Sequence, residues 1–316
     1  MIRLALSSVI YLFLVFFAHK TLADEAFITA QNAQSLDIID LTSMTKRLSV
    51  PIAGKPAGVA LSKDGRRVFV TSPEGHFVTI VDREAGRIEK QIPVKGGPLG
   101  IAVTRAGERL YVTDFYGDML VEIDLITQKQ RYLSIGAKPA GLALTLDEKT
   151  LLVAARDDNQ IIFVDLNEFS RLDQLAVGRH PYGVTIDADG RRAYVANVES
   201  DSVSVIDLAS RKAIAQLRVE SHPYGIALAS GRIFISNQHS ESLSVFDAKD
   251  LTHVATVAVG DYPEGVCASS DGATIYVANW FSNDLWAIDA ATLKVRAKTA
   301  TSDGPRAFGQ FVAPAP

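Results

Sequence analysis

Cysteine is almost absent from this sequence: Cys267 is the single one among 316 residues, so no internal disulfide can form. It lies in the apolar stretch 265–268, where we expect it to act as a small buried packing residue. An excess of basic charge is also lacking, since 32 Lys and Arg stand against 36 Asp and Glu, for a net charge of −4. Nucleic-acid binding needs a strongly basic surface, so we do not expect nucleic acid as a partner.

The common sequence signatures of catalytic and cofactor sites are missing as well. No serine stands in a Gly-x-Ser-x-Gly elbow, and there is no phosphate-binding glycine loop or dinucleotide fingerprint. No Cys-x-x-Cys-His sequence could attach haem. A functional site must therefore be sought where the fold brings distant residues together, because no local motif marks one.

Long apolar runs are confined to the first residues. Arg3 precedes an apolar stretch over 4–18, and small residues end at Ala23, which is the pattern of a secretory signal peptide. A membrane anchor is the alternative, but the stretch is shorter than the roughly 20 residues that span a bilayer. We therefore expect residues 1–23 to be cleaved, leaving a periplasmic protein with no membrane span. The cleavage would remove Arg3, Lys20 and no acid, so 30 basic residues would face 36 acidic ones, a net charge of −6.

What the sequence does contain is one strand pattern repeated along its length. Each copy is an alternating apolar run closed by aspartate, as in 203–207 and 243–247, and the copies recur about every 41 residues. The closing residues are Asp40, Asp82, Asp124, Asp165, Asp207, Asp247 and Asp289. A fixed period of this length indicates stacked supersecondary units. A short carboxylate at a strand end also suits a turn, because it can accept hydrogen bonds from amides two residues further on.

One repeat contains four short strands. After Asp165, strands are predicted at 172–177, 184–186 and 193–197, ahead of the aspartate strand 203–207. An Asp-Gly pair separates two of them and is a strong hairpin signal, because the turn needs a positive φ that glycine adopts freely. The pair occurs at 64–65, 189–190 and 271–272.

The two ends of the chain decide between a closed β-propeller and a linear β-solenoid. The N-terminal part supplies three strands, at 27–29, 36–40 and 48–52, without the first strand of its unit, and 304–312 supplies only that strand. Joined, they complete one blade. The sequence therefore predicts an all-β protein in which residues 24–316 form one seven-bladed β-propeller of four-stranded antiparallel blades, closed by three N-terminal strands and one C-terminal strand.

The second strands of several repeats share a motif: YVAN at 194–197 and 276–279, FISN at 234–237 and YVTD at 111–114, each after a Pro-x-Gly element. They resemble the YVTN-type β-propeller repeats of secreted and periplasmic bacterial proteins, over essentially the whole mature chain. Related propellers include surface-layer proteins, proteins that accompany quinone- or haem-dependent dehydrogenases, and metal-dependent lactonases and lyases. The resemblance therefore implies the scaffold and not one particular function.

The predicted site follows from blade topology. The connection into the inner strand and the loop after the second strand emerge on one face, where Pro-x-Gly elements or their counterparts surround the mouth of the central channel. Polar and aromatic residues concentrate in the last four copies. The predicted ligand-binding residues are His180, Tyr182, His222, Tyr224, Tyr262, Glu264 and Arg306, with Asp114 and Trp280 from the neighbouring loops. Convergent polar groups with aromatic walls at a concave mouth are typical of small-molecule sites.

Two classes of function are open for this face. The first is a monomer that binds a small ligand, a cofactor or a periplasmic partner protein, as an accessory to a redox or cofactor-dependent pathway. The second is a lactonase- or lyase-type enzyme, in which a divalent metal ion or Arg306 polarises a carbonyl and a histidine or Glu264 moves a proton. The candidate metal ligands are His180, His222 and His239, because imidazole suits zinc or copper.

Structural roles compete with these functional ones. The prolines and glycines of the Pro-x-Gly elements are expected to fix the turn and to allow close approach at the crowded centre. Tyr182 and Tyr224 could simply plug the channel, and the two histidines before proline could share a turn hydrogen bond. Asn197, Asn237 and Asn279 are expected to bond to neighbouring backbone.

Overall fold

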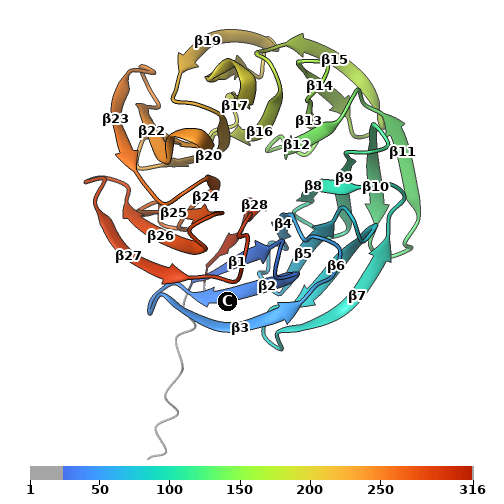
Figure 1. The fold of residues 1–316 in the computed structure, drawn as a ribbon. Coiled ribbons are helices and arrows are strands. Elements are labelled where there is room, and N and C mark those ends of the chain that lie inside the picture. The colour runs from blue at the N-terminus through green and yellow to red at the C-terminus, as the bar shows by residue number, and fades with distance from the viewer. Residues whose placement is uncertain (1–23, 315–316) are drawn as a thin grey trace, which may run out of the picture.

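The computed structural model describes residues 24–314, which form a ring of seven sheets around a central axis (Figure 1). The predicted signal segment, residues 1–23, lies outside the described residues. Within 24–314, helical structure is limited to two short 3-10 turns, Val198–Ser200 and Gln238–Ser240, and no helix has the length and apolarity needed to cross a membrane. The protein is an all-β seven-bladed β-propeller, as the repeat predicts.

Each blade has four antiparallel strands, which follow one another from the axis outward. Blade 1 contains β29 (Val312–Ala313), β1 (Glu25–Ala30), β2 (Ser35–Asp40) and β3 (Thr45–Pro51); blade 2 contains β4 (Gly58–Leu61), β5 (Arg67–Ser72), β6 (Phe77–Asp82) and β7 (Arg87–Pro93). Blade 3 contains β8 (Pro98–Val103), β9 (Arg109–Asp114), β10 (Met119–Asp124) and β11 (Gln130–Ser134); blade 4 contains β12 (Pro139–Leu144), β13 (Thr150–Ala155), β14 (Gln160–Asp165) and β15 (Ser170–Ala176). Blade 5 contains β16 (Pro181–Ile186), β17 (Arg192–Asn197), β18 (Ser202–Asp207) and β19 (Lys212–Arg218). Blade 6 contains β20 (Pro223–Ala229), β21 (Arg232–Asn237), β22 (Ser242–Asp247) and β23 (His253–Ala258); blade 7 contains β24 (Pro263–Ala268), β25 (Thr274–Asn279), β26 (Asp284–Asp289) and β27 (Val295–Ala300).

The repeated aspartates end the third strand of every blade and hold the turn that follows, which confirms their predicted role. In blade 4, Asp165 Oδ1 accepts hydrogen bonds from the amides of Asn167 (2.8 Å) and Glu168 (3.1 Å). The other blades repeat this arrangement with one or two amides. The glycines of the Asp-Gly hairpins have φ values of 67–70°, the left-handed region that glycine adopts at no steric cost.

Apolar side chains fill the spaces between neighbouring blades. Between blades 4 and 5, Leu152 and Phe163 pack against Val195 and Ile206, and all four are at most 1% exposed. The outermost strands, such as β15, are mostly exposed. Each blade is therefore stabilised by burial against two neighbours, and the closed ring leaves few free sheet edges.

The ring closes in blade 1, where the two ends of the described chain meet (Figure 1). Pro305 bridges Ala30, and β29 pairs with β1. Between these contacts the chain leaves β1, and β28 (Phe308–Gly309) pairs in parallel with β4 of blade 2. The predicted one-plus-three closure is therefore confirmed, but the closing strand is interrupted. The interruption coincides with Ala307, which occupies the glycine position of the Pro-x-Gly element and has a φ of 48°.

Candidate binding site at the channel mouth

The Pro-x-Gly elements bring the middle residues of all seven copies to the axis at one level. We call these residues the central ring: Ala57, Leu99, Ala140, Tyr182, Tyr224, Glu264 and Arg306. The glycine that follows each of the first six explains the spacing. A Cβ on Gly183 would lie 2.2 Å from the carbonyl oxygen of Tyr224, and one on Gly58 would lie 2.2 Å from that of Leu99. Glycine is thus required because neighbouring blades approach backbone to backbone.

Hydroxyl groups of the second strands hold the ring carbonyls in place. Thr71 Oγ1 donates to the carbonyl of Leu99 (2.6 Å), and Ser236 Oγ donates to that of Glu264 (2.8 Å). Thr113 makes the equivalent bond to Ala140 (2.7 Å). The backbone of the central ring is therefore fixed by the scaffold, whereas its side chains can differ from blade to blade.

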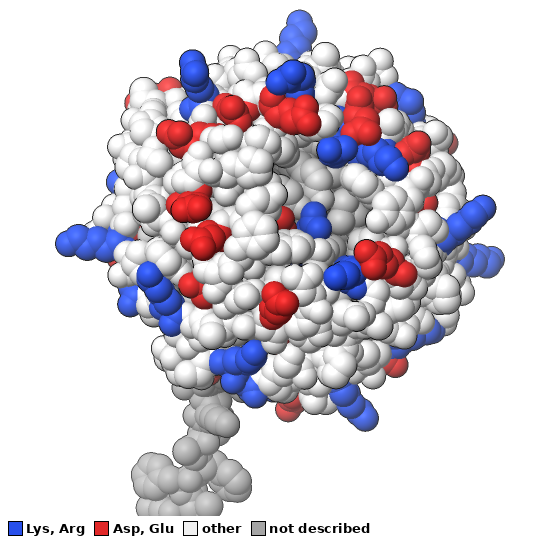
Figure 2. Space-filling model, in the orientation of Figure 1, with Lys and Arg blue, Asp and Glu red and all other residues white. Residues whose placement is uncertain are grey.

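The central ring has an apolar side and a polar side. Ala57, Leu99 and Ala140 form an apolar arc with Phe308, which packs against both tyrosine rings at centroid distances of 5.0 and 5.7 Å. The other side, which we call the polar arc, contains the phenols of Tyr182 and Tyr224, the carboxylate of Glu264 and the guanidinium of Arg306. The space-filling view shows a hollow on the ring axis with basic and acidic side chains beside it (Figure 2).

Arg306 contacts the other three residues of the polar arc. Its Nη2 donates hydrogen bonds to the hydroxyls of Tyr182 (2.8 Å) and Tyr224, and its Nε lies 3.3 Å from Glu264 Oε2. The guanidinium carbon lies 5.7 Å from the ring centroid of Trp280. Its Nη1 has no hydrogen-bond partner among residues 24–314, and 17% of the side chain is exposed. A guanidinium fixed in this way can still offer a donor to a ligand.

Glu264 faces Arg306 but is not fully satisfied by it. Its Oε1 accepts a hydrogen bond from Gln238 Nε2 (2.9 Å), while Oε2 has no hydrogen bond in the described structure, and the residue is 4% exposed. Burial raises the pKa of Glu264 to about 7, although Arg306 and Gln238 both act to lower it. Burial also raises the pKa of the Tyr224 hydroxyl well above 10. At neutral pH, therefore, a proton can be gained or lost at Glu264 while the phenol stays protonated.

This raised pKa predicts a pH dependence of stability. Because folding favours the protonated form, the free energy of unfolding should be highest below the ordinary carboxyl value of 4.5 and should fall as pH rises towards about 7. Relative to Glu264→Gln, the parent should lose roughly 3 kcal/mol across this window. Urea unfolding of both proteins at pH 4.5, 6 and 8 measures the difference. Glu168→Gln, which changes an exposed carboxylate, is the control. If the free energies of unfolding of the parent and of Glu264→Gln change with pH in the same way, the pKa of Glu264 is not raised by folding.

An aromatic and imidazole cluster lies beside the polar arc, on blades 6 and 7. We call it the aromatic rim: His222, His239, Tyr262 and Phe281. The two imidazoles stack at 3.7 Å, and the Tyr262 ring lies 5.5 Å from His239 and 4.9 Å from Phe281. Phe281 is 66% exposed. Predicted residues Tyr262 and His222 thus belong to the rim and not to the central ring.

His180 is separate from this cluster. Its Nδ1 lies 2.8 Å from Glu199 Oε1, and its Nε2 lies 3.9 Å from Asp157 Oδ1. Within residues 24–314, no group of three or more His, Cys, Asp or Glu side chains is arranged to hold a metal ion. The structure thus brings His222 and His239 together but does not bring His180 to them, and the predicted three-histidine metal site has no support from the geometry.

Asp114 has the contacts of a scaffold residue. It is 3% exposed, and its Oδ1 accepts hydrogen bonds from the amides of Gly97 (2.6 Å), Gly117 (2.9 Å) and Tyr116 (3.1 Å).

Asparagines occupy the same position in other blades. They were expected to bond to neighbouring backbone, but they bond to side chains. Asn197 Nδ2 instead donates to the hydroxyls of Ser202 (3.2 Å) and Ser204 (3.0 Å), because these serines face it from the adjacent strand. Asn237 and Asn279 likewise donate to side chains of the next strand.

The residues before proline have a left-handed backbone, which the sequence pattern did not indicate. His180, His222 and Tyr262 have φ values of 52°, 58° and 57°. The amides of the two histidines donate to Asn159 Oδ1 and Asp201 Oδ1 of the preceding blade, each at 2.9 Å. These two bonds form a latch that holds the histidine backbone. In the left-handed conformation, all three side chains contact the loops after the second strands. The sequence signal for the latch was an Asn or Asp directly before the third strand, which occurs in four blades, as Asp118, Asn159, Asp201 and Asn283.

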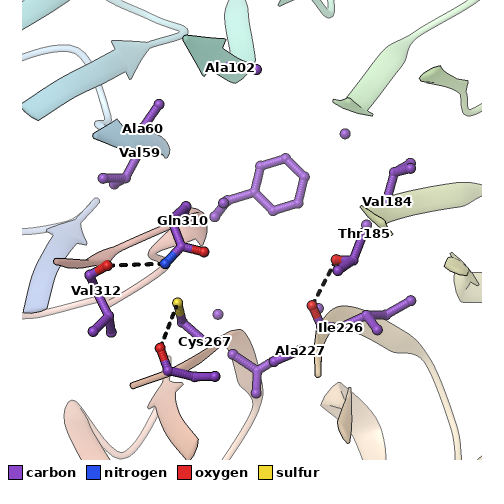
Figure 3. Close-up of a pocket in the computed structure, with 18 of the residues that line it drawn as sticks. Val59, Ala60, Ala102, Val184, Thr185, Ile226, Ala227, Cys267, Gln310 and Val312 are labelled. Atoms are coloured by element: carbon purple, nitrogen blue, oxygen red, sulfur yellow. Dashed lines mark hydrogen bonds between the residues drawn. The ribbon is translucent and has the colours of Figure 1, made fainter. Parts of the chain in front are cut away.

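A second cavity lies below the central ring. It has a volume of about 640 Å³, is lined by the inner strands of the blades, and extends from Phe308 and Gly265 to Ser269 and Ser270 beside an Asp-Gly hairpin (Figure 3). The sequence pattern pointed only to the opposite face. Phe308 belongs both to this cavity and to the apolar arc, and Glu264 also lines the cavity, so the cavity adjoins the channel mouth.

The fold and the mouth together define a seven-bladed β-propeller with a charged, aromatic-walled channel entrance. No protein-family model matches the chain, and no curated protein matches it. Among solved structures, Kuenenia stuttgartiensis hydrazine synthase matches with a TM-score of 0.73 and 20% identity, over 79% of this chain and 88% of that chain. A functionally unknown protein from Desulfotomaculum acetoxidans DSM 771 matches with a TM-score of 0.80 and 12% identity, over 93% of this chain and 99% of that chain. At these identities the likeness shows the propeller fold alone.

Proposed function

We propose that this propeller is a binding protein for a small carboxylate-bearing ligand, which it holds at the channel mouth by Arg306. The observation that carries the proposal is the unsatisfied polar arc. Arg306 Nε and Glu264 Oε2 are both buried without a hydrogen bond, and Nη1 has no partner in the described residues. A buried ion pair gives little net stability and is costly when incompletely bonded. A ligand carboxylate that accepts a hydrogen bond from Nη1 would complete the bonding of this guanidinium.

The surroundings favour a ligand with a flat body. Trp280 lies on one side of the guanidinium, and the aromatic rim extends from the mouth to the exposed ring of Phe281. Aromatic faces bury large areas of a planar ligand at little entropic cost. An aromatic carboxylate could therefore bond to Arg306 while its ring lies against Trp280 or the rim.

A thermal-shift panel of aliphatic and aromatic mono- and dicarboxylates, followed by calorimetry, tests this proposal. We expect aromatic carboxylates to bind and Arg306→Met to weaken them about 10- to 100-fold, since hydrogen bonds to charged groups contribute roughly 1.5–3 kcal/mol. The comparison should be made at pH 6, where Glu264 holds its proton and the variant is not left with a buried unpaired charge. Arg179→Met, which removes an exposed guanidinium from the neighbouring loop, should bind like the parent. Equal binding by Arg306→Met would contradict the proposal.

The second candidate is an enzyme of lactonase or lyase type. It is favoured by one observation, the position of Glu264, with a pKa of about 7, beside the guanidinium of Arg306. Such a pair can move a proton while a carbonyl is polarised. Turnover of a lactone panel that is lost in Glu264→Gln and retained in Glu168→Gln would replace the binding proposal with this one.

We further propose that the protein acts in the periplasm as a YVTN-type propeller, with a small molecule or a periplasmic protein as its partner. Support comes from the signal-like segment 1–23 and from the repeat motifs of the second strands. N-terminal sequencing of the protein from an envelope fraction should give a start near Asp24. A full-length chain in the cytosol would contradict this location.

A further inference from the structure

The cavity below the central ring is a second hollow on the axis and adjoins the mouth. Phe308, whose ring packs against Tyr182 and Tyr224, and Glu264 line its upper end. The other end reaches Ser269 and Ser270, which precede the hairpin at Asp271-Gly272 on the opposite face of the propeller. Its volume of about 640 Å³ is within the range of small-molecule sites.

Two layers of aliphatic side chains line much of this cavity. The residue after each Pro-x-Gly glycine contributes Val59, Ile101, Leu142, Val184, Ile226 and Val266, and the segment that closes blade 1 adds Gln310. Two residues further on, the next layer contributes Leu61, Val103, Leu144, Ile186 and Leu228. Several of these side chains are half-buried, so their exposed surface faces the cavity.

The polar side chains of the wall are bonded to the protein itself. Thr185 Oγ1 donates to the carbonyl of Ile226 (2.8 Å), Gln310 Nε2 donates to that of Val312 (3.0 Å), and Cys267 Sγ lies 3.6 Å from that of Ala268 (Figure 3). In this part of the wall, Gln310 Oε1 is an acceptor that these bonds do not use. The cavity therefore offers carbon surface with Gln310 Oε1 beside it, while Glu264, Ser269 and Ser270 line it towards its two ends.

We propose that this cavity is a separate binding site for an unbranched aliphatic molecule with one hydroxyl-type donor. The aliphatic chain would lie along the axis between the two layers of Val, Ile and Leu, and the donor would bond to Gln310 Oε1. Apolar surface buried in a preformed cavity gives an affinity that grows with chain length. The site is independent of Arg306 and so does not rest on the function proposed for the mouth.

A series of unbranched primary alcohols from butanol to decanol tests the proposal, because these uncharged molecules have no carboxylate for the mouth. Calorimetry should show the dissociation constant falling about fourfold for each added methylene, until the chain outgrows the cavity. Binding that is absent at the solubility limit, or that does not depend on chain length, would overturn the proposal.

Two variants locate the binding. Ala102→Phe should fill part of the cavity and shorten the longest alcohol that binds. Leu144→Ser changes a half-buried side chain of the wall, should weaken every alcohol, and is the second variant in case Ala102→Phe impairs folding. Trp280→Ala, at the mouth, should leave alcohol binding unchanged. Alcohol affinity that survives both cavity variants, or that is lost in Trp280→Ala, would place the alcohols elsewhere and reject the site.

Discussion

Deleting residues 304–316 should prevent the chain from folding into a stable monomer. These residues supply the inner strand of blade 1, including Phe311 and Val312, which are 0% and 4% exposed. Arg83 also donates a hydrogen bond to the carbonyl of Pro314 (2.8 Å). Removing a buried aromatic ring alone costs roughly 3–5 kcal/mol, and the total stability of a protein is about 5–15 kcal/mol. The loss of the whole strand should therefore remove most of the stability.

The deletion should also expose the edge of β1, because its partner strand would be gone. A free, apolar strand edge pairs readily with other chains, so we expect aggregation in size-exclusion chromatography together with loss of the cooperative unfolding transition. A chain that lacks only residues 315–316 keeps the whole closing strand and is the control. If the protein that lacks residues 304–316 is a monomer and has the same unfolding midpoint as the parent, the ring does not depend on this closure.

Gly183→Val should be among the most damaging single substitutions near the site. The added Cβ would lie 2.2 Å from the carbonyl oxygen of Tyr224, and that oxygen belongs to backbone which cannot rotate away. Blades 5 and 6 would have to separate at the centre, where Tyr182 and Tyr224 now contact Arg306. We expect a loss of about 3 kcal/mol or more, at the upper end of what overpacking costs, measured by urea unfolding.

Gly107→Ala provides the matched control. This glycine has a φ of 70°, and no atom lies within 4 Å of the position that an added Cβ would occupy. The substitution should therefore cost only the left-handed strain of a non-glycine residue, about 1 kcal/mol. Equal losses for the two variants would contradict the close approach between blades as the reason for glycine at 183, because Gly183 has no positive φ that would itself require glycine.

The sequence predicted the fold well because its repeat has a direct structural cause in every blade. Asp165 and its six counterparts recur because each holds a turn, and the Asp-Gly pairs recur because each needs a positive φ. The interruption of the closing strand was not predicted. It involves Ala307 in a position that is glycine in the other copies, and a single exception gives no period from which to infer where the chain goes.

The site was predicted less completely. Topology alone places Tyr182, Tyr224, Glu264 and Arg306 at one level, so these residues could be grouped from the sequence. Their contacts could not be predicted, because they depend on which side chain of another blade reaches across. Gln238 of blade 6 bonds to Glu264 of blade 7, and Arg306 of the closing segment bonds to Tyr182 and Tyr224. The left-handed latch before proline was also missed, because non-glycine residues rarely adopt that conformation.

The fixed backbone of the central ring has a consequence for how such a mouth can change. Glycine, proline and the hydroxyls behind them set the path of the chain, while the ring side chains play no part in the pairing of the strands. Ala57 and Ala140 have only a methyl side chain at the ring position that is occupied by Tyr224 and Arg306 in other copies of the element. A new specificity could therefore evolve by exchanging single side chains on the apolar arc, one blade at a time, without any movement of the backbone that carries them.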